Sequence, residues 1–415
     1  MYNDKRQVKD TKIGFSNRFY MLVVSGSVSR AGTTAFSVYI LWITLAITGS
    51  ALLAGLADGF YTFPLIFSFY FGALIDRKVR KKGIMAGAGL MRVGAIMLVL
   101  AAVLIHEYLL VILLIYSGVI ITGMMSDIQN SIRSAWTKVF LKEEQYQRGT
   151  SFLNALTSIA EGIGFAVSGI MIYFGYIEAV ILLSLISVIS VIPVILIKED
   201  RIVASDTVKW NVRKDMLEAV SFIRKSRSLL QLIILMIFAN FVIAMIGIGF
   251  TFTVEKVLDV SAFYLSLIFV ALFIGIASGS IPGGSIRGTL GPVVSSLLGV
   301  IGAIFIIVSY VENALILASL VFGIGFSIGI INSAVQTVLI RKVPVTMMAR
   351  IMGALNTFAL SATFLSGTIA GAIIEFFTIR SLFVIIGIAS IVVAAMVIFM
   401  KDFSRERIEH VTENA

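Results

Sequence analysis

Five charged side chains fall inside long apolar stretches of the sequence, where no water would solvate a charge. They are Arg30, Asp58, Arg92, Asp127 and Glu161. A charge inside hydrocarbon is costly and usually faces another charge or a cavity, so each of the five is a candidate functional residue. The chemistry that such a group can perform is the uptake and release of protons, because a carboxylate that is removed from water and not fully paired tends to bind a proton.

The helix rise of about 1.5 Å per residue predicts that these charges share one level of a membrane. Arg30 and Asp58 both come out roughly 18 Å from the inner surface, so we expect them to pair. Asp127 and Glu161 come out at roughly 16–20 Å and Arg92 near 13 Å. Since the carboxylates outnumber the arginines, we expect Glu161 or Asp127 to carry the proton. The alternative is a static network of ion pairs that fixes the helix packing.

In the second half of the chain, neutral polar side chains lie at the corresponding depths in the membrane. They are Asn240, Asn332, Gln336 and Asn356, with Thr363 at the repeat position of Glu161. We expect the amides to offer hydrogen bonds to a small-molecule solute, and the alternative is that they bond between helices. Tyr39 is an aromatic candidate for the lining of an apolar pocket, and the alternative is that it faces the core or the lipid.

The stretches that must position these residues are typical of a membrane protein. Of the 415 residues, 59% are hydrophobic and only 13% are charged, whereas a soluble domain has roughly 25% charged residues. Long apolar runs without alternation predict helices and disfavour a barrel. Breaking the sequence at its charged and turn-rich points gives twelve segments, at about 18–46, 50–74, 83–104, 109–138, 148–174, 177–197, 228–255, 260–284, 290–309, 313–340, 349–375 and 380–400.

The longest polar stretch divides the twelve segments into six and six. We therefore predict an all-α membrane protein with a first six-helix bundle at 1–197 and a second bundle with a short tail at 228–415. The apolar residues of the linker, 198–227, recur at helical spacing among charges, which predicts an amphipathic helix on the inner membrane surface.

The two halves also resemble each other in sequence. Ser134-Ala135 and the later Arg148 correspond to Ser333-Ala334 and Arg350. Repeated halves place a solute site between them, near the middle of the membrane, and allow one half to rock against the other.

The distribution of positive charge predicts the orientation. Of the 33 Lys and Arg residues, only Lys256 and Arg380 fall in loops on the side opposite the termini. Cytoplasmic loops are the ones rich in Lys and Arg, so we expect both termini in the cytoplasm. The formal net charge of +10 then reflects orientation and does not indicate nucleic-acid binding.

The sequence lacks the residues that metal binding, ATP hydrolysis and common enzyme mechanisms require. There is no cysteine, and the two histidines, His106 and His410, share no metal-ligand spacing, so we expect no metal site and no cofactor. No G-x-x-x-x-G-K-[ST] run is present to bind ATP, and no Ser/His/Asp or H-E-x-x-H arrangement favours an enzyme. The expected partners are a small organic molecule, protons and the lipid bilayer.

The loop between the second and third segments is similar to a known pattern. Gly72, Asp76, Arg77, Arg80 and Lys81 match the G-x-L-[AS]-D-[RK]-x-G-R-[RK] loop of the major facilitator superfamily, with Val79 in place of the second glycine. Further similar stretches are Asn17-Arg-Phe, Thr48-Gly-Ser50, 215–224 and 257–261. On these residues the chain resembles the macrolide-efflux-type branch of drug:proton antiporters. The resemblance implies a monomeric carrier in the cell membrane that alternates access to its two sides.

The same loop has the chemistry of a latch. Asp76 can accept hydrogen bonds or face the positive end of a neighbouring helix in one conformation and lose these contacts in the other. The resemblance implies a neighbour near 348–353, with Arg133 as a possible partner. The alternative is that the cluster is only a signal for membrane orientation.

Two departures from the family pattern bear on direction. Phe165 stands where exporters of this superfamily usually carry the proline of an antiporter motif, and the second-half counterpart loop, 279–287, has no aspartate. We expect a secondary active transporter, most simply a proton-coupled exporter of a lipophilic or amphipathic, drug-like or macrolide-like compound. The alternatives are a proton-coupled symporter or facilitator, and a lipid or lysolipid flippase of the same fold.

Overall fold

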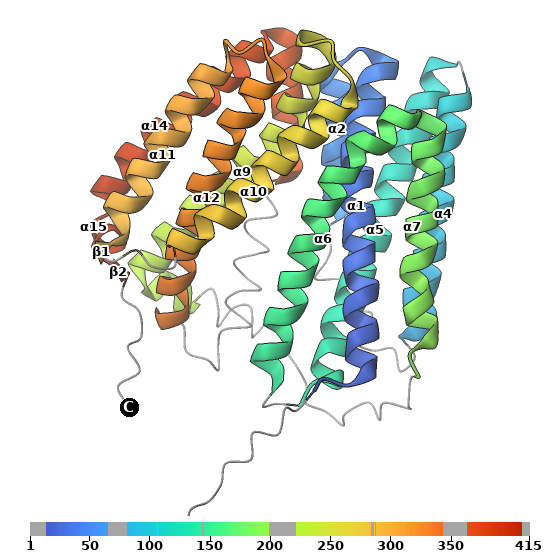
Figure 1. The fold of residues 1–415 in the computed structure, drawn as a ribbon, viewed down its shortest axis with the longest axis horizontal. Helices are drawn as coiled ribbons and strands as arrows, with labels where there is room; N and C mark the ends of the chain where they lie inside the picture. The colour runs from blue at the N-terminus through green and yellow to red at the C-terminus, as the bar shows by residue number, and fades with distance from the viewer. Residues whose placement is uncertain are drawn as a thin grey trace, which may run out of the picture.

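The computed structural model describes residues 14–64, 81–105, 107–142, 145–198, 221–283, 286, 288–342 and 363–408. The helices of the first half are α1 (Asn17–Thr48), α2 (Ala51–Thr62), α4 (Lys82–Leu104), α5 (Tyr108–Phe140), α6 (Tyr146–Phe174) and α7 (Tyr176–Leu196). Figure 1 shows them as one group of near-parallel rods, in which α1 packs against α6 and α7, and α4 packs against α5 and α7.

The second half forms a similar group. Its elements are α9 (Arg227–Phe252), the π-helix η3 (Thr253–Val257), α10 (Ala262–Gly283), β1 (Gly288–Thr289), α11 (Leu290–Val308), α12 (Ala314–Lys342), α14 (Ile379–Phe399), α15 (Lys401–Ser404) and β2 (Arg407–Ile408). A shorter apolar helix, Thr363–Phe376, precedes α14. The two short strands pair antiparallel, with Gly288 opposite Ile408.

The predicted segments agree closely with these helices. Ten of the twelve are helices long and apolar enough to cross a membrane. The other two, 50–74 and 349–375, lie partly outside the described residues and are seen as α2 and as the helix Thr363–Phe376. The linker at 198–227 is described only at its two ends, so its amphipathic helix and the three domain boundaries stay predictions.

Local signals explain where the first helix begins and ends. The Ser16 hydroxyl accepts a hydrogen bond from the backbone N–H of Phe19, which satisfies one of the free donors of the first turn. At the other end Gly49 adopts φ 67°, a left-handed conformation that glycine takes without strain, and its N–H bonds to the Leu45 carbonyl. Ser50 then caps α2 in the same way as Ser16 caps α1.

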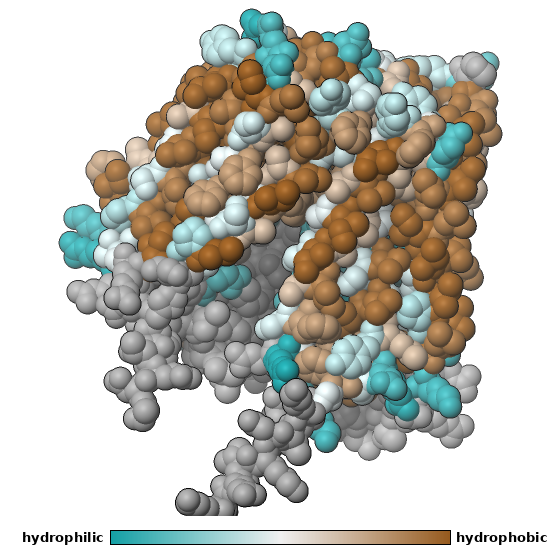
Figure 2. All heavy atoms as spheres, viewed as in Figure 1, coloured by the Kyte–Doolittle hydropathy of each residue, from teal (hydrophilic) through white to brown (hydrophobic). Residues whose placement is uncertain are grey.

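The outer surface is apolar over most of its height (Figure 2). Many large hydrophobic side chains are exposed there, among them Leu109, Leu196, Ile281 and Phe399. Exposed apolar area on this scale is what a lipid-facing surface requires, because lipid replaces water as the solvent. The chain is a multi-pass membrane protein.

Two helices from different halves, α6 and α10, contact each other. A Cβ at Gly169 would overlap the carbonyl of Ala262, and the Gly169 N–H donates to the Ser266 hydroxyl at 2.9 Å. Only a glycine permits this approach, since any side chain there would collide with backbone. Nearer the middle of α6 the Phe165 ring contacts Phe269 of α10, with ring centroids 4.6 Å apart.

A second contact between the halves joins α2 to the helix Thr363–Phe376. A Cβ at Gly55 would overlap the Gly367 carbonyl, and one at Gly371 would overlap the carbonyl of Ala51. The Glu375 carboxylate accepts hydrogen bonds from the Ser50 hydroxyl at 3.1 Å and from the Ala51 N–H at 2.9 Å. This carboxylate therefore compensates the positive end of a helix in the other half.

Both contacts lie at the end of the molecule remote from the termini. We call this the far end, and the end at which α1 begins and α14 ends the terminal end. Figure 1 shows α6 and α10 together near the far end and diverging toward the terminal end. Among the described helices, the two halves therefore contact each other at the far end and part toward the terminal end.

Replacing Gly55 with leucine should open the far end, because the added side chain has no space against Gly367. The chain has no cysteine, so spin labels at Glu107→Cys and Glu312→Cys, two exposed far-end positions in different halves, report the opening without background. We expect a longer distance between labels in the Gly55→Leu protein. Gly87→Leu is the matched control, since nothing lies within 4 Å of a Cβ at Gly87. An unchanged distance in Gly55→Leu would contradict the role of this contact.

Candidate functional site

Arg30 of α1 pairs with Glu161 of α6 and not with Asp58. Its Nη2 donates to Glu161 Oε1 at 2.7 Å and its Nε donates to Oε2 at 3.2 Å, which is a two-point contact between guanidinium and carboxylate. The two side chains are 47% and 30% exposed, so the pair borders open space between the helices. The expectation that Arg30 and Asp58 satisfy each other is wrong.

The physical reason is helix length. The estimate from sequence treated each segment as spanning about 30 Å of hydrocarbon, but α1 has 32 residues and is therefore about 48 Å long. Arg30 lies about 27 Å from the far end of α1, whereas Asp58 lies only about 10 Å from the far end of α2. Glu161, about 20 Å from the far end of α6, is within reach of the long arginine side chain.

Asp58 lies in the contact between the two halves. Its side chain is half-buried, and a Cβ at Gly367 would fall 2.8 Å from its Oδ2 atom. Within the described part of the chain, no hydrogen bond or ion pair reaches this carboxylate. The surroundings of this carboxylate must therefore change when the far end opens.

Arg92 of α4 is buried and bonded to neutral oxygen atoms. Nη1 donates to the Ser29 hydroxyl at 2.8 Å and to Gln129 Oε1 at 3.2 Å, and Nη2 donates to the Ser190 hydroxyl at 3.2 Å. These contacts join α4 to α1, α5 and α7. No carboxylate among the described residues neutralises the Arg92 charge.

A polar cavity of about 80 Å³ lies beside the Arg30–Glu161 pair, between α1, α2 and α5. Its lining residues are Ser29, Arg30, Thr33, Tyr61, Gly123, Ser126, Asp127, Asn130 and Arg133. Asp127 is buried, at 3% exposure. The cavity therefore brings together two of the predicted proton-coupling residues and one residue of the predicted latch.

Arg133 is nearly buried and incompletely bonded. It is 8% exposed, and Nη1 donates to Asn130 Oδ1 at 2.8 Å. Its Nε and Nη2 atoms are buried and have no hydrogen-bond partner among the described residues. Gly26 of α1 leaves the space for this side chain, since a Cβ there would lie 2.8 Å from Arg133 Nε.

The remaining latch residues cannot be assessed in the same way. Gly72, Asp76, Arg77 and Arg80 lie outside the described residues, and Lys81 directly precedes α4. The latch thus stays a prediction.

The balance of charge in this region is the reverse of the one expected from sequence. Among the described residues, Arg30 and Arg133 line the cavity and Arg92 bonds to its lining residue Ser29, while Asp58 lies apart at the far-end contact. Two carboxylates accompany these three arginines, that of Asp127 in the lining and that of Glu161 on Arg30. The described part of the site therefore has an excess of one positive charge, not of one negative charge.

The predicted polar residues of the second half do not gather at one site. Asn240 donates to the Met236 carbonyl one turn earlier in α9, at 2.9 Å. Gln336 is exposed near the terminal end of α12, and Asn356 lies outside the described residues. Tyr39 lines no cavity that the structure describes: it is 1% exposed, and its hydroxyl donates to the Tyr176 carbonyl at 3.1 Å, so it joins α1 to α7.

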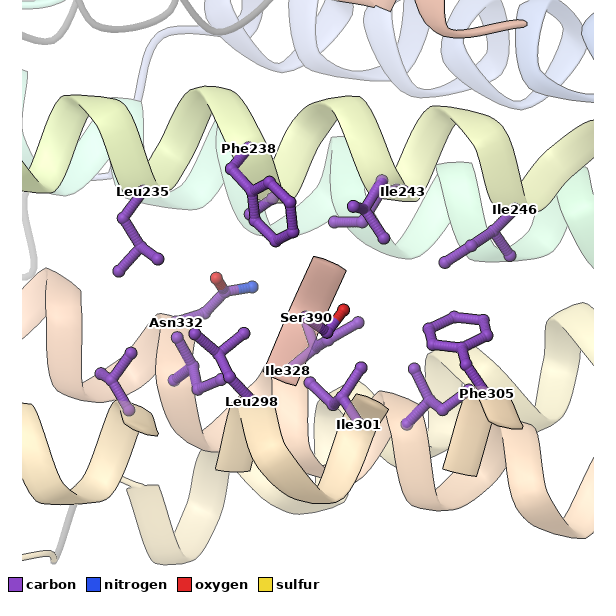
Figure 3. A pocket seen from close by; sticks show the side chains of 15 residues that line it. Leu235, Phe238, Ile243, Ile246, Leu298, Ile301, Phe305, Ile328, Asn332 and Ser390 are labelled. Carbon is purple, nitrogen blue, oxygen red and sulfur yellow. The ribbon is translucent and has the colours of Figure 1, made fainter. Parts of the chain in front are cut away.

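Asn332 does border a pocket, which is otherwise apolar. Figure 3 shows side chains of α9, α11 and α12 converging on it, with Phe238 and Ile243 facing Leu298 and Ile301. Its volume is about 70 Å³, and Asn332 and Ser390 are the only polar residues in its lining. The pocket suits an apolar group, with one amide available to orient it.

Residues that the sequence prediction missed complete the polar cavity. The missed Ser126 and Asn130 recur with the predicted Arg133 every three or four residues along α5, and Tyr61 joins them from α2. The polar stripe on α5 recurs with helical periodicity inside an apolar segment, so it could have been recognised from the sequence. Tyr61 had no such signal.

This arrangement defines a membrane transporter: two helical groups, parted at one end, with charged side chains between the helices where a solute can enter. The chain belongs to the Major Facilitator Superfamily, whose sequence profile matches residues 22–367. It is therefore a transporter of small molecules and not an enzyme.

Solved structures support the same fold. The nucleoside transporter NupG has 14% sequence identity and a TM-score of 0.71, over 93% of this chain and 99% of that chain. A bacterial homolog of the human lysosomal transporter Spinster, in an inward-facing and occupied conformation, has 10% identity and a TM-score of 0.68, over 93% of this chain and 96% of that chain. A POT family transporter with a bound peptide conjugate has 11% identity and a TM-score of 0.65, over 92% and 95%. No curated protein matches the chain.

A double-mutant cycle should identify the partner of Arg30. We expect Arg30→Gln and Glu161→Gln to be coupled by about 0.5–1 kcal/mol, because the pair is partly exposed and its charges are screened. The measurement is thermal or denaturant unfolding of the purified protein. The control cycle combines Arg30→Gln with Asp58→Asn and should give no coupling. Coupling in the control cycle alone would contradict the observed pairing.

Proposed function

We propose that the protein exports a lipophilic or amphipathic organic compound from the cytoplasm in exchange for protons, by alternating access. The observation that carries this proposal is the contrast between the two ends, closed at the far end by glycine contacts and parted at the terminal end. Alternating access needs two such states, of which this is one.

Two cavities support this substrate class. The apolar pocket of the second half suits an apolar group, and the polar cavity of the first half suits a polar group. A drug-like or macrolide-like molecule carries both kinds of surface. The resemblance of the loop from Gly72 to Lys81 to the macrolide-efflux branch favours the same class.

Asp58 is the first candidate for the residue that binds the exchanged proton. The sequence analysis favoured Glu161 or Asp127 because Arg30 was expected to neutralise Asp58, and the observed pairing removes that reason. The Asp58 carboxylate instead occupies a contact that must break when the far end opens. Glu161 is the second candidate, since it would be released whenever Arg30 moves away.

The proposed cycle links protonation of Asp58 to closure. When the far end is open, Asp58 meets external water and binds a proton. Closing the far end then buries a neutral group, which costs much less than burying a carboxylate. Tyr61, one turn further along α2, lines the polar cavity and offers a route for release of the proton toward the terminal end.

The proposal includes the membrane setting predicted from sequence. Both termini lie in the cytoplasm, the protein works as a monomer in the cell membrane, and the linker at 198–227 joins the bundles at 1–197 and 228–415. Asp76 forms a latch at the cytoplasmic mouth, with contacts that are made in one conformation and lost in the other.

One observation favours symport as a second candidate. Phe165 stands in place of the proline of the antiporter motif, and its ring contacts those of Phe269 and Phe273 at the contact between the halves. Direction must therefore be measured and not assumed from the family.

Inverted membrane vesicles provide the test. We expect uptake of a radiolabelled amphipathic drug, such as the carboxylate fusidate, when the vesicle interior is acidic, and loss of this gradient-driven uptake in Asp58→Asn. Exchange of substrate down its own gradient should persist in Asp58→Asn, because the variant can still close.

Glu312→Gln is the matched control, since it neutralises an exposed carboxylate at the far end that pairs only with Arg380. Uptake driven by an acidic exterior would indicate symport. Gradient-driven uptake that survives in Asp58→Asn would remove Asp58 from the mechanism, and movement of labelled phospholipid alone would favour a flippase.

A further inference from the structure

The polar cavity of the first half is a cationic site. Among the described residues, Arg30 and Arg133 line it, Arg92 bonds to the lining residue Ser29, and the carboxylates of Asp127 and Glu161 oppose these three positive charges. A solute that carries no charge would leave this excess uncompensated inside the membrane.

Arg133 is the group with unused bonding capacity. Two of its nitrogen atoms, Nε and Nη2, are buried without a hydrogen-bond partner among the described residues, while Nη1 is held by Asn130. Nε and Nη2 lie on one edge of the planar guanidinium, the edge that binds carboxylate and phosphate oxygens in pairs. A buried donor without a partner costs free energy, which a bound anion would restore.

The rest of the lining fits the same ligand. The Tyr61 hydroxyl can donate a hydrogen bond to an anionic oxygen, whereas the hydroxyls of Ser29, Thr33 and Ser126 already donate to Gln129 Oε1 and to the carbonyls of Arg30 and Thr122. The cavity also adjoins the exposed Arg30–Glu161 pair, which gives it access to the space between the halves.

We propose that this cavity binds an anionic group, a carboxylate or a phosphate, of the transported molecule, with Arg133 as the contacting residue. The proposal rests on the transport function above and narrows its substrate class to amphipathic anions. The Arg30–Glu161 pair keeps Arg30 occupied, so Arg133 makes the contact, with the Tyr61 hydroxyl as a further donor.

Binding to the purified full-length protein tests this assignment without any transport. The probes are benzoate and phenyl phosphate, with benzyl alcohol and benzylamine as neutral and cationic counterparts of similar size, measured by calorimetry in neutral phosphatidylcholine nanodiscs. We expect the two anions to bind about tenfold or more tightly than benzyl alcohol. Equal affinity of anions and benzyl alcohol would overturn the proposal.

Arg133→Gln should weaken binding of the anions by about 10- to 100-fold and leave benzyl alcohol unaffected. Arg133→Lys should retain a preference for anions, because the charge remains, and it replaces Arg133→Gln if that variant does not fold. Arg380→Gln is the control, since it removes an exposed arginine at the far end. Full anion affinity in Arg133→Gln would overturn the assignment, as would loss of the preference in Arg380→Gln.

The source of the anionic group needs a separate arm of the experiment. If a lipid headgroup occupies the cavity, phosphatidic acid in the nanodisc should compete with phenyl phosphate in the native protein. If a free solute occupies it, phosphatidic acid should have no effect. Both results place an anion at Arg133. Binding that depends on Arg133 without proton-driven uptake would refute the proposed exchange and leave this inference intact.

Discussion

The cost of placing a charge in hydrocarbon governs where this chain keeps its ionisable side chains. An unpaired charge in that environment is too costly to face lipid, so each one must face a partner or a cavity. The clearest case is the pair between Arg30 and Glu161, which joins α1 to α6 beside the space between the halves. Because Arg30 and Glu161 neutralise each other, this pair determines which charges remain to be compensated. These are the charges of the polar cavity, of the buried Arg92 and of Asp58.

Glycine determines where the two halves can meet. At Gly55, Gly169 and Gly371 a single Cβ would overlap a backbone carbonyl of the opposite half. Such close contacts are strong when formed and cannot be held at intermediate distances, which suits an interface that is either closed or open. Asp58 lies within one of these contacts, so any change in its charge acts on the closed state directly.

The sequence predicted the architecture well because apolar length and charge position follow from the membrane itself. Segments such as 177–197 and 290–309 agree with α7 and α11 to within a residue or two. The pairing of charges was predicted less well. Depth was estimated from a uniform membrane thickness, and α1 is much longer than that thickness, so Arg30 was paired with Asp58 and not with Glu161.

Partners across helices depend on rotation and tilt, which a single sequence does not contain. Arg133 illustrates this point, since its place on α5 was clear from the sequence but its exposure to the same cavity as Arg30 was not. Tyr39 illustrates the converse. It looked able to line a pocket, and its hydroxyl is used to hold α1 against α7.

The central claim is that protonation of Asp58 favours closure of the far end. Two label pairs on the cysteine-free chain test it directly: Glu107→Cys with Glu312→Cys at the far end, and Lys142→Cys with Lys401→Cys at the terminal end. On raising the pH, the far-end distance should lengthen and the terminal-end distance should shorten, whereas in Asp58→Asn neither distance should depend on pH. Distances in the native protein that do not change with pH, or an Asp58→Asn protein that responds as the native one does, would contradict the account.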